Sequence, residues 1–209
     1  MTVAALMPRA EMVHWWFATG FLSIGLLLFA EAIVGTEVWA RRPWRKPLIV
    51  FTPKSMLRHP DACSTIDDLA QPHFLPVVPD REVTDAKRIL IASGKVGHEL
   101  KAERRKRKDS STAILFLDQL YPLPRPEITA AIAAHPHARE VVWVQEEPRN
   151  MGAFSYVMPR LAQLVQDLGL NLRSVKRSSS ASPATGSAKA HELEQKTLLS
   201  LAFTTTSGD

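Results

Sequence analysis

The residues best suited to chemistry form a short loop, Ser93-Gly94-Lys95, between an apolar run and a helical pattern. Where a strand gives way to a helix, free backbone N–H groups point outward, and a neighbouring lysine adds a full charge that attracts anions. A phosphate-binding P-loop also needs a glycine five residues before its Gly-Lys pair, and that position is Ile89. The loop therefore suits either anion binding or a plain strand-to-helix turn, and ATP hydrolysis is not expected.

Other reactive side chains do not assemble into a catalytic or metal site. Glu146 and Glu147 end a predicted strand, where neighbouring side chains point to opposite faces, so we expect one to turn inward and one to be exposed. The histidines lack metal-ligand spacing, and His135 and His137 fall at the end of a predicted helix. Cys63 is the single cysteine, and we interpret it as a structural thiol. We expect no catalytic residue, bound metal or bound cofactor in this chain alone.

Basic residues gather late in the helix predicted after Gly94. They are Lys101, Arg104, Arg105, Lys106, Arg107 and Lys108. Cations are favourable near a helix C-terminus, but six exceed what capping needs. The run is therefore either a solvated face or a surface for an acidic partner or anionic ligand. The formal net charge of the chain is only +5, which is too modest to indicate a nucleic-acid partner.

The elements that must position these residues follow an α/β pattern. Strands are predicted at 48–51, 74–78, 87–93, 114–119, 140–145 and 172–175, with Pro76 marking an edge strand. Helices are predicted at 64–70, 95–109, 126–135 and 154–169. Apolar strands that alternate with helices indicate a mainly parallel sheet covered on both faces. We expect a three-layer αβα sandwich with ligands at the carboxyl ends of its strands.

The ends of the chain differ from this domain. Residues 15–35, within an N-terminal segment spanning 1–40, form an apolar helix pattern long enough for a bilayer and are followed by four cations. This segment is a candidate transmembrane helix or a buried core helix, and the positive-inside rule keeps the rest of the chain in the cytoplasm or matrix. A small-residue loop precedes a weakly amphipathic helix at 191–203, and residues 204–209 are predicted to be a disordered tail.

Five blocks, in order, carry a family resemblance. They are RKPLIVFTPKSMLRHP (45–60), RILIASGKV (88–96), LDQLYPLP (117–124), VVWVQEEPRNMGAFSYVMPRL (141–161) and SSSASPATGS (178–187). Over residues 41–203 the chain resembles the C-terminal domain of the thiamine-diphosphate-dependent, decarboxylating component of 2-oxoglutarate dehydrogenase, a family that includes multifunctional 2-oxoglutarate metabolism enzymes. The resemblance implies the transketolase C-terminal fold, a homodimer, catalytic domains of the same enzyme as partners, and a part in the tricarboxylic acid cycle.

The resemblance also implies an effector site. Some family members bind an adenine nucleotide or acetyl-CoA on this domain, and the matching positions here are Arg58, Ser93, Gly94 and Lys95, with Arg104 or Arg105 nearby. Thiamine diphosphate and magnesium serve the full-length family, but its GDG cofactor signature is absent from this sequence. Residues 1–40 depart from the family, and the join near Arg41 suggests a truncated or misjoined gene product.

Our first interpretation is therefore a structural and regulatory C-terminal domain without its own decarboxylase activity. The alternative is a membrane-anchored, non-catalytic α/β interaction module, and an autonomous enzyme ranks last. We expect the mitochondrial matrix as the location in a eukaryote and the cytoplasm in a bacterium, with membrane association if residues 15–35 span a bilayer.

Overall fold

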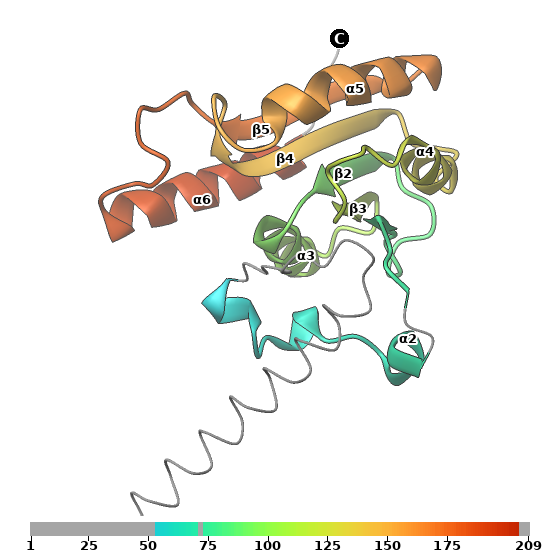
Figure 1. Ribbon diagram of the computed structural model, residues 1–209, viewed down its shortest axis with the longest axis horizontal. Coiled ribbons are helices and arrows are strands. Elements are labelled where there is room, and N and C mark those ends of the chain that lie inside the picture. The colour runs from blue at the N-terminus through green and yellow to red at the C-terminus, as the bar shows by residue number, and fades with distance from the viewer. Residues whose placement is uncertain (1–52, 71–72, 205–209) are drawn as a thin grey trace, which may run out of the picture. The chain divides into compact units, whose positions relative to one another are not determined.

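The computed structural model describes residues 53–70 and 73–204 of the chain (Figure 1). The predicted strand at 48–51, the candidate transmembrane helix at 15–35 and the tail at 205–209 lie outside these residues. Within the described ranges, no helix combines the length and the apolar character needed to cross a bilayer. The described part is an α/β fold, as the sequence predicts.

A five-stranded sheet forms the centre of the described fold. Its order is β1 (Val77–Val78), β3 (Thr112–Leu117), β2 (Arg88–Ala92), β4 (Glu140–Pro148) and β5 (Asn171–Arg177). β2 pairs in parallel with β3 and β4, and β4 pairs in parallel with β5, whereas β1 runs antiparallel to β3. The predicted edge strand is confirmed as an edge of this sheet, although it is only two residues long.

Helices connect the strands and flank them at both ends of the domain. They are η2 (Lys54–Met56), η3 (Pro60–Ala62), α2 (Ile66–Ala70), α3 (Lys95–Arg107), α4 (Arg125–Ala133), α5 (Phe154–Asp167) and α6 (Ala188–Phe203). Thr65 caps α2, because its hydroxyl accepts the Asp68 N–H while the Asp68 carboxylate accepts the Thr65 N–H, each at 3.2 Å. Gly169 follows α5 with φ 70°, a conformation that favours glycine at a helix end.

Helices cover both faces of the sheet (Figure 1). One core joins the odd-numbered residues of β1, β2, β3 and β4 to α4 and α5, and includes Ile89, Ile91, Leu115, Ile128 and Leu161. The other core joins the even-numbered residues of β2, β3 and β4 to α3 and α6, and includes Leu90, Leu100, Ile114, Val142 and Leu198. Strands buried on both faces explain why the sequence shows continuous apolar runs rather than alternation.

The chain reverses its winding direction at β2. From β2 it passes through α3, on one face, to β3, and then returns through α4, on the opposite face, to β4 on the other side of β2. The carboxyl ends of β2 and β4 therefore meet at a topological switch point. Open α/β sheets bind ligands in the crevice at such a point.

Candidate functional site

A cavity of about 320 Å³ lies at the switch point between β2 and β4. Its walls come from the residues that follow β2 and β3, from β4, and from the turn before α5. They are Ser93, Leu120, Trp143, Gln145, Glu147, Gly152 and Ala153. The predicted position of the site, at the carboxyl ends of the strands, thus coincides with a cavity of small-molecule size.

One buried amide fixes the turn beside this cavity. The side chain of Gln145 donates from Nε2 to the carbonyls of Glu147, Pro148 and Met151, at 3.3, 3.2 and 3.0 Å. Its Oε1 accepts the indole N–H of Trp143 at 3.1 Å. Because Gln145 is only 3% exposed, these hydrogen bonds hold the turn in one conformation. The sequence analysis did not single out Gln145. The feature that could have indicated it is a lone amide side chain directly after the apolar run VVWV.

The Ser93-Gly94-Lys95 loop does begin a helix, as predicted. Gly94 has φ 73° and stands at the N-cap of α3. The first turn has no side-chain cap, although the Gly97 N–H donates to the Gly94 carbonyl at 3.2 Å. The Lys95 ammonium, however, lies 2.6 Å from the Glu99 carboxylate one turn later, and this hydrogen bond raises the pKa of Lys95. Gln195 on α6 donates to the same carboxylate. An anion at this loop therefore competes with Glu99 for Lys95.

The glutamate pair differs in burial, as expected from its position on a strand. Glu146 is half-buried and Glu147 is exposed, although β4 continues to Pro148 beyond the predicted end. Burial raises the pKa of Glu146, the charge of Lys95 opposes that rise, and the carboxylates of Glu147 and Glu99 add to it. The two glutamates therefore lie in different surroundings.

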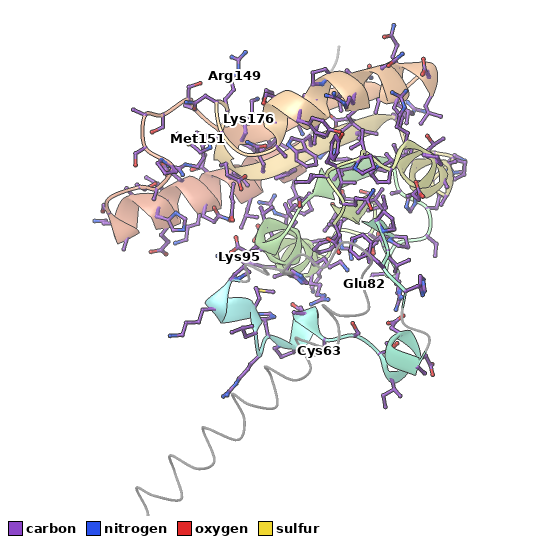
Figure 2. All side chains as sticks on the ribbon, viewed as in Figure 1. Cys63, Glu82, Lys95, Arg149, Met151 and Lys176 are labelled. Carbon is purple, nitrogen blue, oxygen red and sulfur yellow. The ribbon has the colours of Figure 1, made fainter. Side chains whose placement is uncertain are left out.

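Arg104 lies away from the loop, whereas Arg105 and Gly94 both line a cavity of about 630 Å³. Arg104 is only 2% exposed, forms ion pairs with Asp80 and Glu82, and donates to the Thr112 carbonyl at 3.1 Å. This burial corrects the expectation of a wholly solvated basic run. Nine residues of helix place Arg104 about 14 Å along α3 from Lys95. In Figure 2, Lys95 and Glu82 lie well apart.

Arg105 also forms ion pairs with carboxylates of the same chain. Its guanidinium lies 2.8 Å from Asp61 and 2.8 Å from Glu82. These ion pairs join the segment around η3 and the segment before β2 to the last turn of α3. Arg58 follows η2, is exposed, and forms no side-chain hydrogen bond or ion pair within the described part of the chain.

The remaining candidates stay separate. His135 is buried, whereas His137 is exposed and lies 2.8 Å from Asp85. Cys63 is exposed, so it does not pack into either described core. Among residues 53–70 and 73–204, no group of three or more histidine, cysteine, aspartate or glutamate side chains is placed to hold a metal ion.

Comparison with known proteins gives a consistent family match. The family model described as 2-oxoglutarate dehydrogenase C-terminal matches residues 63–203. The 2-oxoglutarate dehydrogenase E1 component of Cupriavidus necator is 43% identical over 165 residues, which cover 78% of this chain and 17% of the relative. The E1 component of Azotobacter vinelandii is 41% identical over 169 residues, covering 78% and 18%.

A multifunctional enzyme gives a similar match. The multifunctional 2-oxoglutarate metabolism enzyme of Mycolicibacterium vanbaalenii is 38% identical over 165 residues, which cover 76% of this chain and 13% of the relative. The chain thus spans less than a fifth of the length of these three relatives.

Proposed function

The chain belongs to the 2-oxoglutarate dehydrogenase C-terminal family, and we propose that it is a non-catalytic, structural and regulatory domain of a 2-oxoglutarate dehydrogenase with a transketolase-like fold. The observation that carries the proposal is that the family match, at residues 63–203, coincides with the α/β domain. The thiamine diphosphate and magnesium of this family do not fit the donors present. The sequence contains no GDG signature, and the described residues place no group of three or more histidine, cysteine, aspartate or glutamate side chains to hold a metal ion. No step of the decarboxylation is assigned to this chain.

The structural part of the proposal concerns the carboxyl edge of the sheet. Asn150, in the turn held by Gln145, donates to the Ser180 carbonyl at 2.9 Å and accepts the Ser180 N–H at 3.1 Å. This pair joins the turn after β4 to the loop after β5. On the same edge the ring of Tyr121 is 80% exposed. We propose that this ordered rim packs against the catalytic domains, within a homodimer of the complete enzyme.

An activity assay tests the non-catalytic part. The purified chain, supplied with thiamine diphosphate and magnesium, is expected to show no 2-oxoglutarate-dependent reduction of ferricyanide. The reason is that the sequence contains no GDG signature for holding the cofactor. Turnover above that of the same assay without 2-oxoglutarate would contradict the proposal.

The regulatory part concerns the Ser93-Gly94-Lys95 loop. We propose that it binds a phosphate group of an adenine nucleotide or acetyl-CoA. Three features support this. The first turn of α3 has no side-chain cap, a lysine stands beside it, and, apart from the two neighbouring residues, no described residue places a heavy atom within 4 Å of where a Cβ on Gly94 would stand. Binding would release Lys95 from Glu99, because the phosphate and the carboxylate compete for one ammonium group.

Calorimetry with acetyl-CoA and with adenosine monophosphate tests this site. Lys95→Ala is expected to weaken binding by about 1–3 kcal/mol, the range for a charge-assisted hydrogen bond. Glu99→Gln should strengthen binding, because it removes the competing carboxylate. Lys106→Ala is the matched control, since Lys106 is 81% exposed and its charge is screened. Equal affinities for wild type, Lys95→Ala and Glu99→Gln would remove the site from this loop.

A further inference from the structure

A second cavity, of about 650 Å³, opens at the opposite, amino-terminal edge of the sheet. Residues that begin or precede β2, β4 and β5 form its walls, together with the end of α6. Five of them matter here: Lys87, Arg88, Arg139, Glu140 and Phe203. We call this cavity the amino-edge groove. Its volume lies within the range of small-molecule sites.

Arg88 gives the groove a specific hydrogen-bonding group. Its side chain is only 9% exposed, and its Nε donates to Glu140 at 2.7 Å. The two terminal nitrogens of its guanidinium form no hydrogen bond within the described residues, yet they are not among the fully buried unpaired atoms. They therefore keep some accessible surface, and Arg88 lines the groove. A guanidinium fork held in this way matches two oxygens of a carboxylate or phosphate group.

The single negative charge of Glu140 does not neutralise both of the guanidinium groups that donate to it. One of its carboxylate oxygens accepts from Arg88 and the other from Arg173, at 2.7 and 2.9 Å. The terminal nitrogens of Arg173 donate to the carbonyls of Leu201 and Thr204, so every nitrogen of its guanidinium makes a hydrogen bond to the protein. Arg88 is thus the guanidinium that keeps donors available for a ligand.

Two more cations lie side by side at the same edge. The N–H of Arg139 donates to the carbonyl of Lys87 at 3.0 Å, which continues the parallel register of β2 and β4 by one residue. Both side chains are exposed, and neither forms an ion pair within the described part of the chain. Like charges at directly opposed positions repel each other, so an anion between them would relieve a real cost.

The balance of charge favours an anion. The groove is lined by four cations and two carboxylates, the second being Asp109. Helix C-termini also point toward this edge and add partial negative charge, which explains why cations gather there. The helix dipoles explain why cations gather at this edge, but they do not explain the unpaired fork of Arg88. A favourable interaction with a dipole requires only a nearby positive charge, not a buried and oriented pair of N–H donors.

We propose that the amino-edge groove binds a small organic anion. Its carboxylate or phosphate head is held by the fork of Arg88, and the exposed cations Lys87 and Arg139 line the rim of the groove from the neighbouring strand positions. Its apolar body lies against Phe203, which packs on the same face of the sheet as Arg88. This site is separate from the Ser93-Gly94-Lys95 loop, because the two lie at opposite ends of β2.

Three probes separate the contributions of head and body. Calorimetry on the full chain would use phenyl phosphate, benzoate and inorganic phosphate. Phenyl phosphate and benzoate share a ring and differ in the head, whereas inorganic phosphate lacks a body. We expect saturable binding of at least one ring-bearing probe, weaker binding of inorganic phosphate, and loss of affinity as salt is raised. The preferred head then identifies the ligand as a carboxylate or a phosphate.

Substitutions locate the binding. Arg88→Lys keeps a charge for Glu140 but removes the fork, and is expected to weaken binding roughly tenfold or more. Lys87→Ala and Arg139→Ala change exposed residues and should each weaken it severalfold. Lys189→Ala, which removes one exposed cation at the start of α6, is the control and should leave affinity unchanged. Failure of all three probes to bind wild type, or an equal loss in Lys189→Ala, would overturn the proposal.

Discussion

Arg104 on α3 forms an ion pair with Asp80, and the two side chains are only 2% and 0% exposed. Asp80 also accepts the N–H of Ile114 on β3, at 2.7 Å. One carboxylate thus joins the segment before β2 to a helix and to a strand. Neither side chain is accessible to water, so removal of one partner leaves the other charge buried without this ion pair.

Arg104→Met is therefore expected to lower the free energy of unfolding by about 3–5 kcal/mol, because it leaves the Asp80 carboxylate buried and unpaired. Urea denaturation followed by circular dichroism measures the change. Lys106→Met is the matched control on the same helix, since Lys106 is 81% exposed, and it should change stability by less than about 0.5 kcal/mol. Similar losses of unfolding free energy for both variants would show that the buried ion pair contributes no more to stability than an exposed lysine does.

Gly97 should tolerate no side chain, although it lies inside a helix. A Cβ at this position would overlap the ring of Phe116 on β3, which is itself only 6% exposed. We expect Gly97→Ala to destabilise the fold by about 1–3 kcal/mol through overpacking. Helix propensity alone predicts the opposite sign, a gain of about 1 kcal/mol. Gly186→Ala is the control, because apart from its two chain neighbours no described residue lies within 4 Å of its Cβ position. Thermal denaturation of both variants decides between the two signs.

Glu82 should make stability depend on pH in the acid range. Its hydrogen bond to Arg105, together with the nearby Arg104, lowers its pKa from 4.5 to about 2, although burial opposes this. Since the folded-state pKa is lowered, its contribution is complete above pH 4.5 and is lost as the pH falls through about 2.

Glu82→Gln removes this contribution. The difference in free energy of unfolding between wild type and Glu82→Gln is expected to shrink steadily across that interval. Urea titrations at several pH values measure the difference, and a constant gap would show that Glu82 is not the titrating group.

The sequence predicted the central strands well because their signals are local. The runs at 87–93, 114–119 and 140–145 became β2, β3 and β4, each displaced by at most three residues at either end. β1 was predicted at 74–78 and shrank to Val77–Val78. Pro76 and Pro79 lack the N–H that a ladder requires, so only the two residues between them can pair in full.

The site was predicted less completely, because its contacts join distant parts of the chain. The spacing of Lys95 and Glu99 already indicates an ion pair on one helix face, and this signal was available in the sequence. Asp80 lies 24 residues before Arg104, so the burial of Arg104 was not visible there. The amino-edge groove depends on the register of parallel strands, which places Lys87 beside Arg139. No local pattern encodes that register.

A chimaeric enzyme tests the central claim most directly. In the E1 component of Cupriavidus necator, the segment that matches this chain at 43% identity would be replaced by the corresponding residues of this chain. If the chain is a structural C-terminal domain of this family, the chimaera should reduce ferricyanide with 2-oxoglutarate in a thiamine-diphosphate-dependent manner, whereas the relative lacking that segment should not. A soluble, dimeric chimaera without this activity would contradict the account.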